Sequence, residues 1–182
     1  FLNNGYFAGK VGIGTDSPVA KLHVYQNDTE VDTAAGVTIE QDGTGDAALS
    51  FLLSSVRRWR LGIDNSDSDK FKISDSTNLA SSNKLTIDTS GNVGIGTTSP
   101  GTKLEISDDT APTLTLRNPS ANPANAGMIR FIESTNTDGF QLTFNGSDNK
   151  LKFISDSSGT EATRMVIQRA DGNVGIGTDS PD

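Results

Sequence analysis

Residues 91–100 read GNVGIGTTSP, and the part from Val93 onward occurs three times in the chain with one residue varied. VGIGTDSP occupies residues 11–18, VGIGTTSP occupies 93–100, and VGIGTDSP returns at 174–181. The phrase therefore recurs about every 81 residues. A long, regular period is typical of stacked structural units rather than of a single enzymatic core.

The repetition extends well beyond the phrase itself. Val37–Ile39 corresponds to Leu114–Leu116, and Trp59–Ile63 corresponds to Phe140–Phe144. The sequence thus predicts three parts, namely an N-terminal shaft motif (1–20), a first repeat unit (21–102) and a second repeat unit (103–182). We expect this chain to be a segment of a longer array.

Composition indicates that one chain lacks a full core of its own. Hydrophobic residues make up 33 % of the 182 residues, against roughly 45–50 % in a typical soluble domain, although that benchmark also counts glycine. The regular patterning argues against disorder, so we expect identical neighbouring chains to supply the missing core.

Charge and residue usage exclude several classes of protein. The net charge of −8 and the absence of a long basic stretch argue against nucleic acid as a partner. There are no cysteines, hence no disulfides and no thiolate metal sites. The longest apolar stretch, residues 47–56, is interrupted by serines, which argues against membrane insertion.

The repeated phrase is predicted to form the return arm of a tight hairpin. Apolar residues alternate with a period of two on both sides of the turn cluster at 89–92, which indicates strands. Gly-Asn pairs favour such turns because both residues tolerate positive φ. Glycines at alternate positions of the phrase should leave one strand face bare, so that another chain could approach closely. The structural motif comprises Gly12, Gly14, Gly91, Asn92, Gly94, Gly96, Gly172, Asn173, Gly175 and Gly177.

Further strands are predicted along the rest of each unit. In the second unit we expect them at Lys103–Ile106, Leu114–Leu116, Met128–Ile132, Phe140–Phe144 and Leu151–Ile154. The segment Ala47–Arg60 has enough apolar residues for a helix. Its counterpart, Gly127–Gln141, carries Asn, Thr, Asp and Gly, which favours a strand pair in both units. The predicted fold class is all-β.

The stretch GNVGIGTTSPGTKLEI (91–106) resembles the repeat of bacteriophage tail fibres and related bacterial surface fibres. The resemblance covers nearly the whole chain. It implies an elongated, intertwined homotrimer in which small β-domains are joined by VGIGT hairpin shaft elements. In that family a self-cleaving chaperone often follows the shaft, and residues 1–182 contain no counterpart of it.

The expected function is structural. The chain would be part of a phage tail fibre that positions receptor-binding tips at the host surface, located on the virion. Its expected partners are its own copies in a parallel homotrimer, further fibre or tail proteins, and a cell-surface glycan. A bacterial surface or secreted filament or adhesin subunit is the first alternative, and a carbohydrate-processing tailspike-like enzyme is a remote one.

Several residue patterns resemble sites of chemistry, and none predicts a catalytic residue, a cofactor or a metal site. Gly12-Ile13-Gly14 resembles part of a dinucleotide-binding loop, but no helix is expected to follow it. Asp64, Asp67 and Asp69 resemble a calcium loop without its central Gly and closing Glu, so a polar hairpin tip competes with an ion site. His23, the only histidine, is either a surface residue or a ligand at a trimer axis.

One basic and aromatic cluster, residues 57–60, could contact a receptor. Arg58 and Trp59 are the candidates, because an indole ring stacks on sugars and a guanidinium pairs with anions. The competing interpretation has Trp59 filling core space, since Phe140 stands at the corresponding position in the second unit.

Overall fold

A computed structural model describes residues 7–27, 36–54, 57–121, 123–124, 126–133 and 138–181. The chain divides into two compact units, residues 1–112 and 113–182. In the described residues every regular element is a strand except one short 3₁₀ turn, η1 (Asn65–Asp67). The all-β prediction is therefore confirmed. No helix in the described part is long and apolar enough to cross a membrane.

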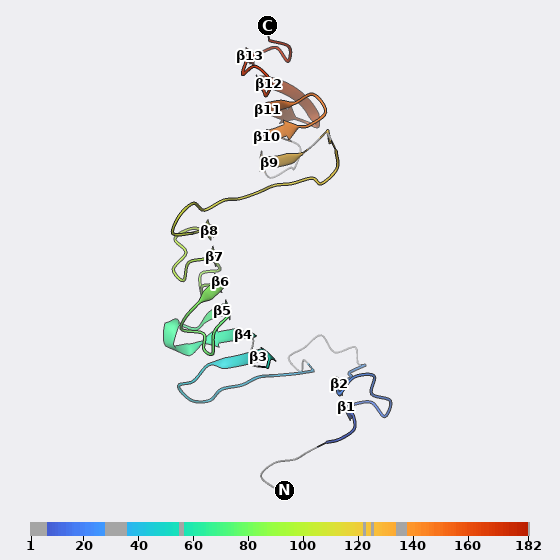
Figure 1. The fold of residues 1–182 in the computed structure, drawn as a ribbon, viewed down its shortest axis with the longest axis vertical. Helices are drawn as coiled ribbons and strands as arrows, with labels where there is room; N and C mark the ends of the chain where they lie inside the picture. Colours follow the sequence, from blue (N-terminus) through green and yellow to red (C-terminus); the bar gives the residue numbers. More distant parts are fainter. Residues whose placement is uncertain are drawn as a thin grey trace. The chain divides into compact units, whose positions relative to one another are not determined.

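The first unit contains a six-stranded sheet with the strands in chain order (Figure 1). All neighbours are antiparallel except the last two, which run parallel. A separate parallel pair, β1 (Val11–Ile13) and β2 (Leu22–Val24), precedes it. The six strands are β3 (Ala47–Leu53), β4 (Arg57–Asp64), β5 (Lys70–Ser74), β6 (Asn83–Ile87), β7 (Val93–Ile95) and β8 (Leu104–Ile106).

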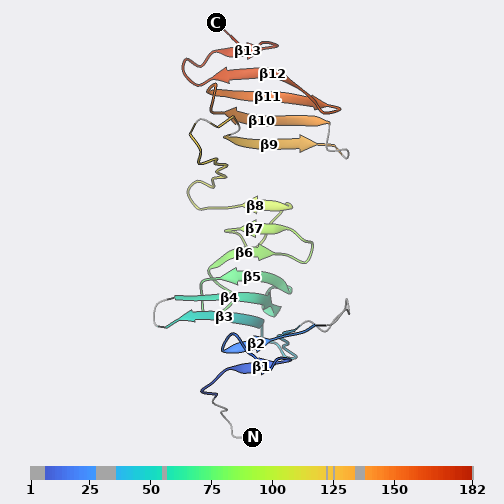
Figure 2. The same ribbon diagram turned by 90° about the vertical axis from the view of Figure 1, so that its right-hand side faces the viewer.

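The second unit repeats this meander with five strands, and Figure 2 shows them following one another in chain order. All neighbours are antiparallel. Both sheets therefore keep their strands in chain order, with five strands in the second unit where the first has six. The strands are β9 (Gly127–Ile132), β10 (Gly139–Asn145), β11 (Lys150–Ser157), β12 (Thr160–Gln168) and β13 (Val174–Ile176).

The strand-pair prediction for the ambiguous segment is confirmed in both units. Residues 47–53 and 57–64 form the antiparallel pair β3–β4, and Phe51 lies opposite Trp59. At the corresponding place in the second unit, Phe131 lies opposite Phe140 in the pair β9–β10. Both pairs set two aromatic residues opposite each other, and such cross-strand pairs stabilise an antiparallel sheet.

The strand predictions around the unit boundary had different outcomes. The strand expected at Lys103–Ile106 does form, as β8 (Leu104–Ile106), and it pairs in parallel with β7 at the end of the first sheet. The predicted repeat boundary between residues 102 and 103 therefore falls between two strands of one sheet, whereas the compact units divide between 112 and 113. The strand expected at Leu114–Leu116 is absent, because this segment pairs with no strand of its own unit.

Candidate interaction surface

One face of the six-stranded sheet consists of apolar side chains along its whole width. Cross-strand register fixes this arrangement, because residues paired in register point to the same face. We call this surface the apolar face of the first unit. One row runs Ala47, Ile63, Phe71, Ile87, Val93, Leu104; the next runs Leu49, Leu61, Ile73, Leu85, Ile95, Ile106; and Phe51 pairs with Trp59 beside them.

The opposite face, the polar face, holds the buried side chains of this sheet. Asp64, Lys72, Ser74 and Thr86 are all at most 2 % exposed. Leu79, from the connection between β5 and β6, is fully buried, and the crossover after β7 places Thr97 and Pro100 against Gly94. The unit therefore buries a polar layer under two loops and leaves its apolar side chains outside.

None of the apolar-face side chains of the first unit is buried. Phe51 is 55 % exposed, Trp59 is 40 % exposed and Ile95 is 43 % exposed. Isolated exposed apolar residues are ordinary on protein surfaces, whereas a contiguous apolar patch marks an interaction site. The face is contiguous, because its members are register neighbours across six strands.

The second unit has the same inverted arrangement. Its apolar face contains the row Ile129, Leu142, Phe153, Met165, Ile176 and the aromatic pair Phe131–Phe140. Phe131 is 64 % exposed. Its opposite face holds the buried Gln141, Thr143, Ile154 and Val166. Recurrence in two units of different sequence shows that the exposed face is a property of the repeat.

A lysine held by acidic side chains organises the polar face of the first unit. Lys72 on β5 donates a hydrogen bond to Asp64 and contacts Asp67, both at the tip of the β4–β5 hairpin. Burial disfavours ionisation of Asp64, but hydrogen bonds from Lys72 and Ser66 outweigh it and lower the pKa of this carboxyl. Burial likewise opposes the charge on Lys72, and the two carboxylates outweigh it and raise the pKa of the ammonium.

This network bears on the calcium-loop alternative. Asp64 and Asp67 are occupied by lysine ammonium groups, since Lys70 also bonds Asp67 at 2.9 Å. Asp64 caps η1 by accepting from the backbone N–H of Ser66 at 3.0 Å. Within the described residues no three acidic or histidine side chains gather as a metal site would require. The polar hairpin tip is the arrangement the structure displays.

Each repeated glycine of the phrase has a structural place. Gly91 (φ 74°) and Gly172 (φ 77°) lie in the hairpin turns before β7 and β13, as predicted. The first turn is closed by Asp88, whose carboxylate accepts hydrogen bonds from the backbone and side-chain nitrogens of Asn92 at 2.9 and 3.0 Å. These bonds lower the pKa of Asp88. In the second turn Asn173 bonds a different position, the carboxylate of Asp171 two residues before it, at 3.1 and 3.3 Å.

The alternate glycines do not share one bare strand face, contrary to the prediction. Gly94 lies within β7, but Gly96 follows the strand with φ 76°. A Cβ on Gly94 would lie 2.7 Å from the carbonyl oxygen of Thr97, and one on Gly96 would lie 2.1 Å from that of Ser107. The neighbour is the same chain, because the crossover from β7 to β8 folds back tightly.

The other two copies of the phrase match in part. A Cβ on Gly12 or on Gly175 would meet the carbonyl of the residue three positions later, at 2.3 and 2.6 Å. A Cβ on Gly14 (φ 75°) would lie 2.1 Å from the carbonyl oxygen of Tyr25, just as one on Gly96 would lie 2.1 Å from that of Ser107. Gly177 (φ 71°) has nothing within 4 Å of such a Cβ.

The two receptor-contact candidates are not brought together. Arg58 and Trp59 are successive residues of β4, so their side chains point to opposite faces of the sheet. Trp59 belongs to the apolar face and, at 40 % exposure, fills no core within its own chain. The core-filling interpretation is thus wrong for the single chain. His23 lies on β2, where its Nδ1 accepts from the backbone N–H of Val19 at 3.4 Å.

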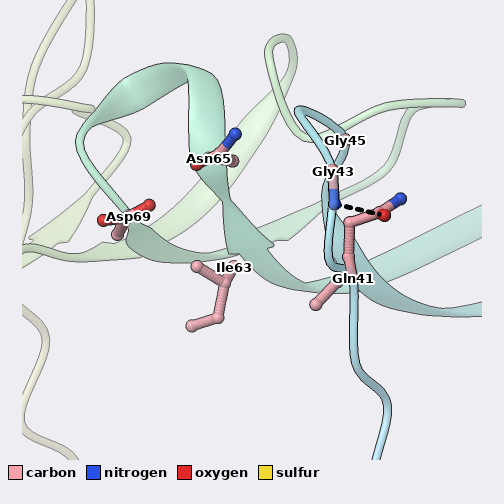
Figure 3. Close-up of a pocket in the computed structure, with 7 residues that line it drawn as sticks. Gln41, Gly43, Gly45, Ile63, Asn65 and Asp69 are labelled. Atoms are coloured by element: carbon pink, nitrogen blue, oxygen red, sulfur yellow. Dashed lines mark hydrogen bonds between the residues drawn. The ribbon is translucent and has the colours of Figure 1, made fainter.

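One pocket lies beside the η1 end of the sheet, lined by Gln41, Ile63, Asn65 and Asp69 among others (Figure 3). Its volume is about 120 Å³, well below the roughly 300 Å³ at which small-molecule sites begin. Gln41 turns back on its own loop, where its Oε1 accepts from the N–H of Gly43 at 3.0 Å. The pocket is therefore too small and too self-occupied to be the functional surface.

Neither the protein-family models nor the curated proteins contain a match to this chain. The apolar faces of the two units are consequently the strongest functional observation in the molecule.

Proposed function

We propose that the chain is a segment of an elongated homotrimeric fibre and acts as a structural and attachment protein, as its resemblance to phage tail-fibre repeats suggests. The single observation that supports this most strongly is the uncovered apolar face present in both units. Identical copies are the natural cover, because the rows named above carry no charged side chain in either unit and would have to be removed from water somewhere.

In this proposal three copies lie parallel and turn their apolar faces toward a shared interior. Each sheet then has its polar layer covered by its own loops and its apolar layer covered by its neighbours. The mechanism is mechanical, since a stiff fibre holds a distal tip away from the particle and repeated weak contacts gain avidity. The proposed location is the virion, and the proposed partners are copies of the chain, other tail proteins and a cell-surface glycan.

One receptor-contact candidate takes a different role in this assembly. Trp59 would be covered in the assembly, so it contributes to association and not to glycan contact. No catalytic role is proposed for any residue. A bacterial surface filament would use the same apolar faces, and the neighbouring genes separate the two origins: baseplate genes accompany a tail fibre, and secretion genes accompany a filament.

The first experiment is the mass in solution by sedimentation equilibrium. We expect three chains per particle at micromolar concentration. A folded monomer would contradict the proposal, and a stable dimer would contradict its trimeric form.

A matched pair of variants tests the face itself. Phe51→Asp and Leu52→Asp place the same charge on adjacent residues of β3 that are 55 % and 60 % exposed. Only Phe51 belongs to the apolar face, because side chains alternate along a strand. Phe51→Asp should dissociate the trimer, whereas Leu52→Asp should leave its mass unchanged. Equal behaviour of the two variants would contradict the assigned face.

A further inference from the structure

Two short segments have a strand-like sequence but lie outside every described strand. Residues 37–40 read Val-Thr-Ile-Glu and residues 114–117 read Leu-Thr-Leu-Arg, and they occupy corresponding positions before β3 and β9. Their apolar side chains are exposed, from 45 % for Leu116 to 66 % for Val37. Alternation of apolar and polar residues with β-branched members is typical of a half-buried strand.

The backbone of both segments lacks hydrogen-bond partners within the described part of the chain. There, the N–H and C=O groups of these eight residues form no hydrogen bond. The second segment touches its own sheet at the start of β9, where Leu116 lies against Gly127 and the N–H of Asn118 donates to the carbonyl of Ala126 at 3.0 Å. That contact leaves the backbone groups of residues 114–117 free to pair with another strand.

The sheets offer matching free edges. β3 and β9 are terminal strands of their sheets, so no strand of the described residues pairs along their outer sides. Both edges carry exposed apolar-face side chains, including Phe51 on β3 and Phe131 on β9. An exposed, apolar edge strand is a template for adding a further strand, and proteins normally cover such an edge.

We propose that residues 114–117 of one copy add as a strand to the outer edge of β9 in a second copy, and that residues 37–40 add in the same way to β3. This inference rests on the proposed homotrimer and specifies how its copies interlock. Strand addition supplies backbone hydrogen bonds through the edge and side-chain contacts through alternate residues. In the single chain Leu114 and Leu116 line a cavity with Ile129 and Leu142. Strand addition would place the same two side chains against the apolar face of the second copy and also give the backbone groups of the segment their partners.

Hydrogen exchange on the assembled protein is the first test. In the assembly, amides within 37–40 and 114–117 should exchange at least about 100-fold more slowly than in an unstructured peptide of the same sequence. Sedimentation of the same sample separates the two proposals. A monomer contradicts the proposed function, whereas a trimer with unprotected amides in both segments contradicts only the strand addition.

Engineered disulfides identify the partner strand. The chain has no cysteine of its own, so a Thr115→Cys variant can be combined in turn with Met128→Cys, Arg130→Cys or Ile132→Cys. These β9 residues lie on the face opposite Ile129 and Phe131, as Thr115 lies opposite Leu114 and Leu116. A disulfide needs Cα atoms about 4.4–6.8 Å apart, so only a true neighbour will form one.

At least one of the three pairs should give covalently linked chains on a non-reducing gel. Thr115→Cys combined with Ser90→Cys, an exposed turn residue of the first unit, is the control and should remain monomeric on the gel. A disulfide confined to one chain would contradict pairing between copies. Failure of all three pairs to cross-link would contradict the assignment of β9 as the partner.

Discussion

The ammonium group of Lys72 lies 2.8 Å from Oδ2 of Asp64, and the two side chains are only 2 % and 1 % exposed. A paired charge of this kind sits at the centre of the layer that the first sheet covers with its own loops. In the second unit Lys152 meets Asp148 at 2.5 Å, but Asn145 stands where the first unit has Asp64. The second unit thus keeps the counterpart of the Lys72–Asp67 contact and lacks the counterpart of the buried Lys72–Asp64 pair.

Replacing the lysine should expose that difference. Lys72→Met leaves a buried carboxylate without its partner, and breaking a buried pair in this way costs about 3 kcal/mol or more. Lys152→Met leaves a partly exposed Asp148 and should cost about 1 kcal/mol or less. Urea unfolding followed by circular dichroism measures both. Equal losses would show that the Lys72 network is no stronger than an ordinary surface pair.

Acidity should weaken the first unit through the same network. The pKa values of Asp64 and Asp67 are lowered from 3.8 in the folded chain, so below that pH the unfolded chain binds more protons than the folded one. Their stabilisation is complete above about pH 4 and is lost as the pH falls through the lowered folded values. Melting curves between pH 2 and 7 should show the melting temperature falling at acidic pH. In Asp64→Asn the melting temperature should depend less on pH, because one of the two carboxylates is gone. An unchanged profile in that variant would count against Asp64.

The opposite limit concerns Lys72. Its pKa is raised above 10.5, so its stabilisation is complete below that pH and disappears as the pH rises through the folded value. Lys72→Met should therefore show a smaller loss of stability above pH 10.5 than the wild type. Thermal melts at pH 9, 10 and 11 provide the measurement, and parallel curves for the two proteins would refute the assignment.

The crossover glycines should differ in cost according to what surrounds them. Gly96 and Gly91 have nearly the same positive φ, 76° and 74°, but only Gly96 would place a Cβ against a backbone carbonyl. Gly91→Ala should cost about 1 kcal/mol for its backbone conformation. Gly96→Ala adds an overpacking term of about 1–3 kcal/mol. Matching melting temperatures for the two variants would show that the crossover tolerates the extra methyl group.

Trp59 provides a direct reporter of assembly, because it is the only tryptophan. It lies on the apolar face and is 40 % exposed in the single chain. As the concentration rises through the association range, its emission should shift to shorter wavelength and acrylamide should quench it less. The control is Leu52→Asp, which should behave as wild type, whereas Phe51→Asp should keep the monomer spectrum. Emission that does not depend on concentration while the mass changes would place Trp59 outside the interface.

The local turn chemistry of the chain was readable in its sequence. Gly91-Asn92 and Gly172-Asn173 each mark a hairpin because the residues that tolerate positive φ are few. The strand assignment of residues 47–60 also followed from pattern, once the second unit was compared with the first. These features depend on neighbours within a few positions.

The side on which each sheet is buried could not be predicted in the same way. Alternation of apolar and polar residues shows that the two faces of a sheet differ, but it does not show which face is buried. Because apolar residues usually lie inside, Trp59 was expected in a core. The structure buries Lys72 instead, because Asp64 and Asp67 reach it from the hairpin tip and the loop carrying Leu79 covers the layer. The parallel pairing of β7 and β8 was also missed. Their connection, residues 96–103, is shorter than the dozen or so residues that parallel neighbours usually require.

That short connection occurs twice with the same hydrogen bonds. At one end of the connection, the backbone N–H of Val93 donates to the carbonyl of Lys103 at 3.0 Å, and Val11 donates to Lys21 at 2.8 Å in the first copy. At the other end, the N–H of Ser107 donates to the carbonyl of Ile95, and Tyr25 donates to Ile13 in the first copy. The connection between the two parallel strands, which we call the joint, is therefore the same in both copies, while the sheets differ in sequence. A gene segment cut within one VGIGT phrase and rejoined within another would encode the same joint. A chain built from such units can exchange, lose or gain whole units by recombination without any junction having to adapt.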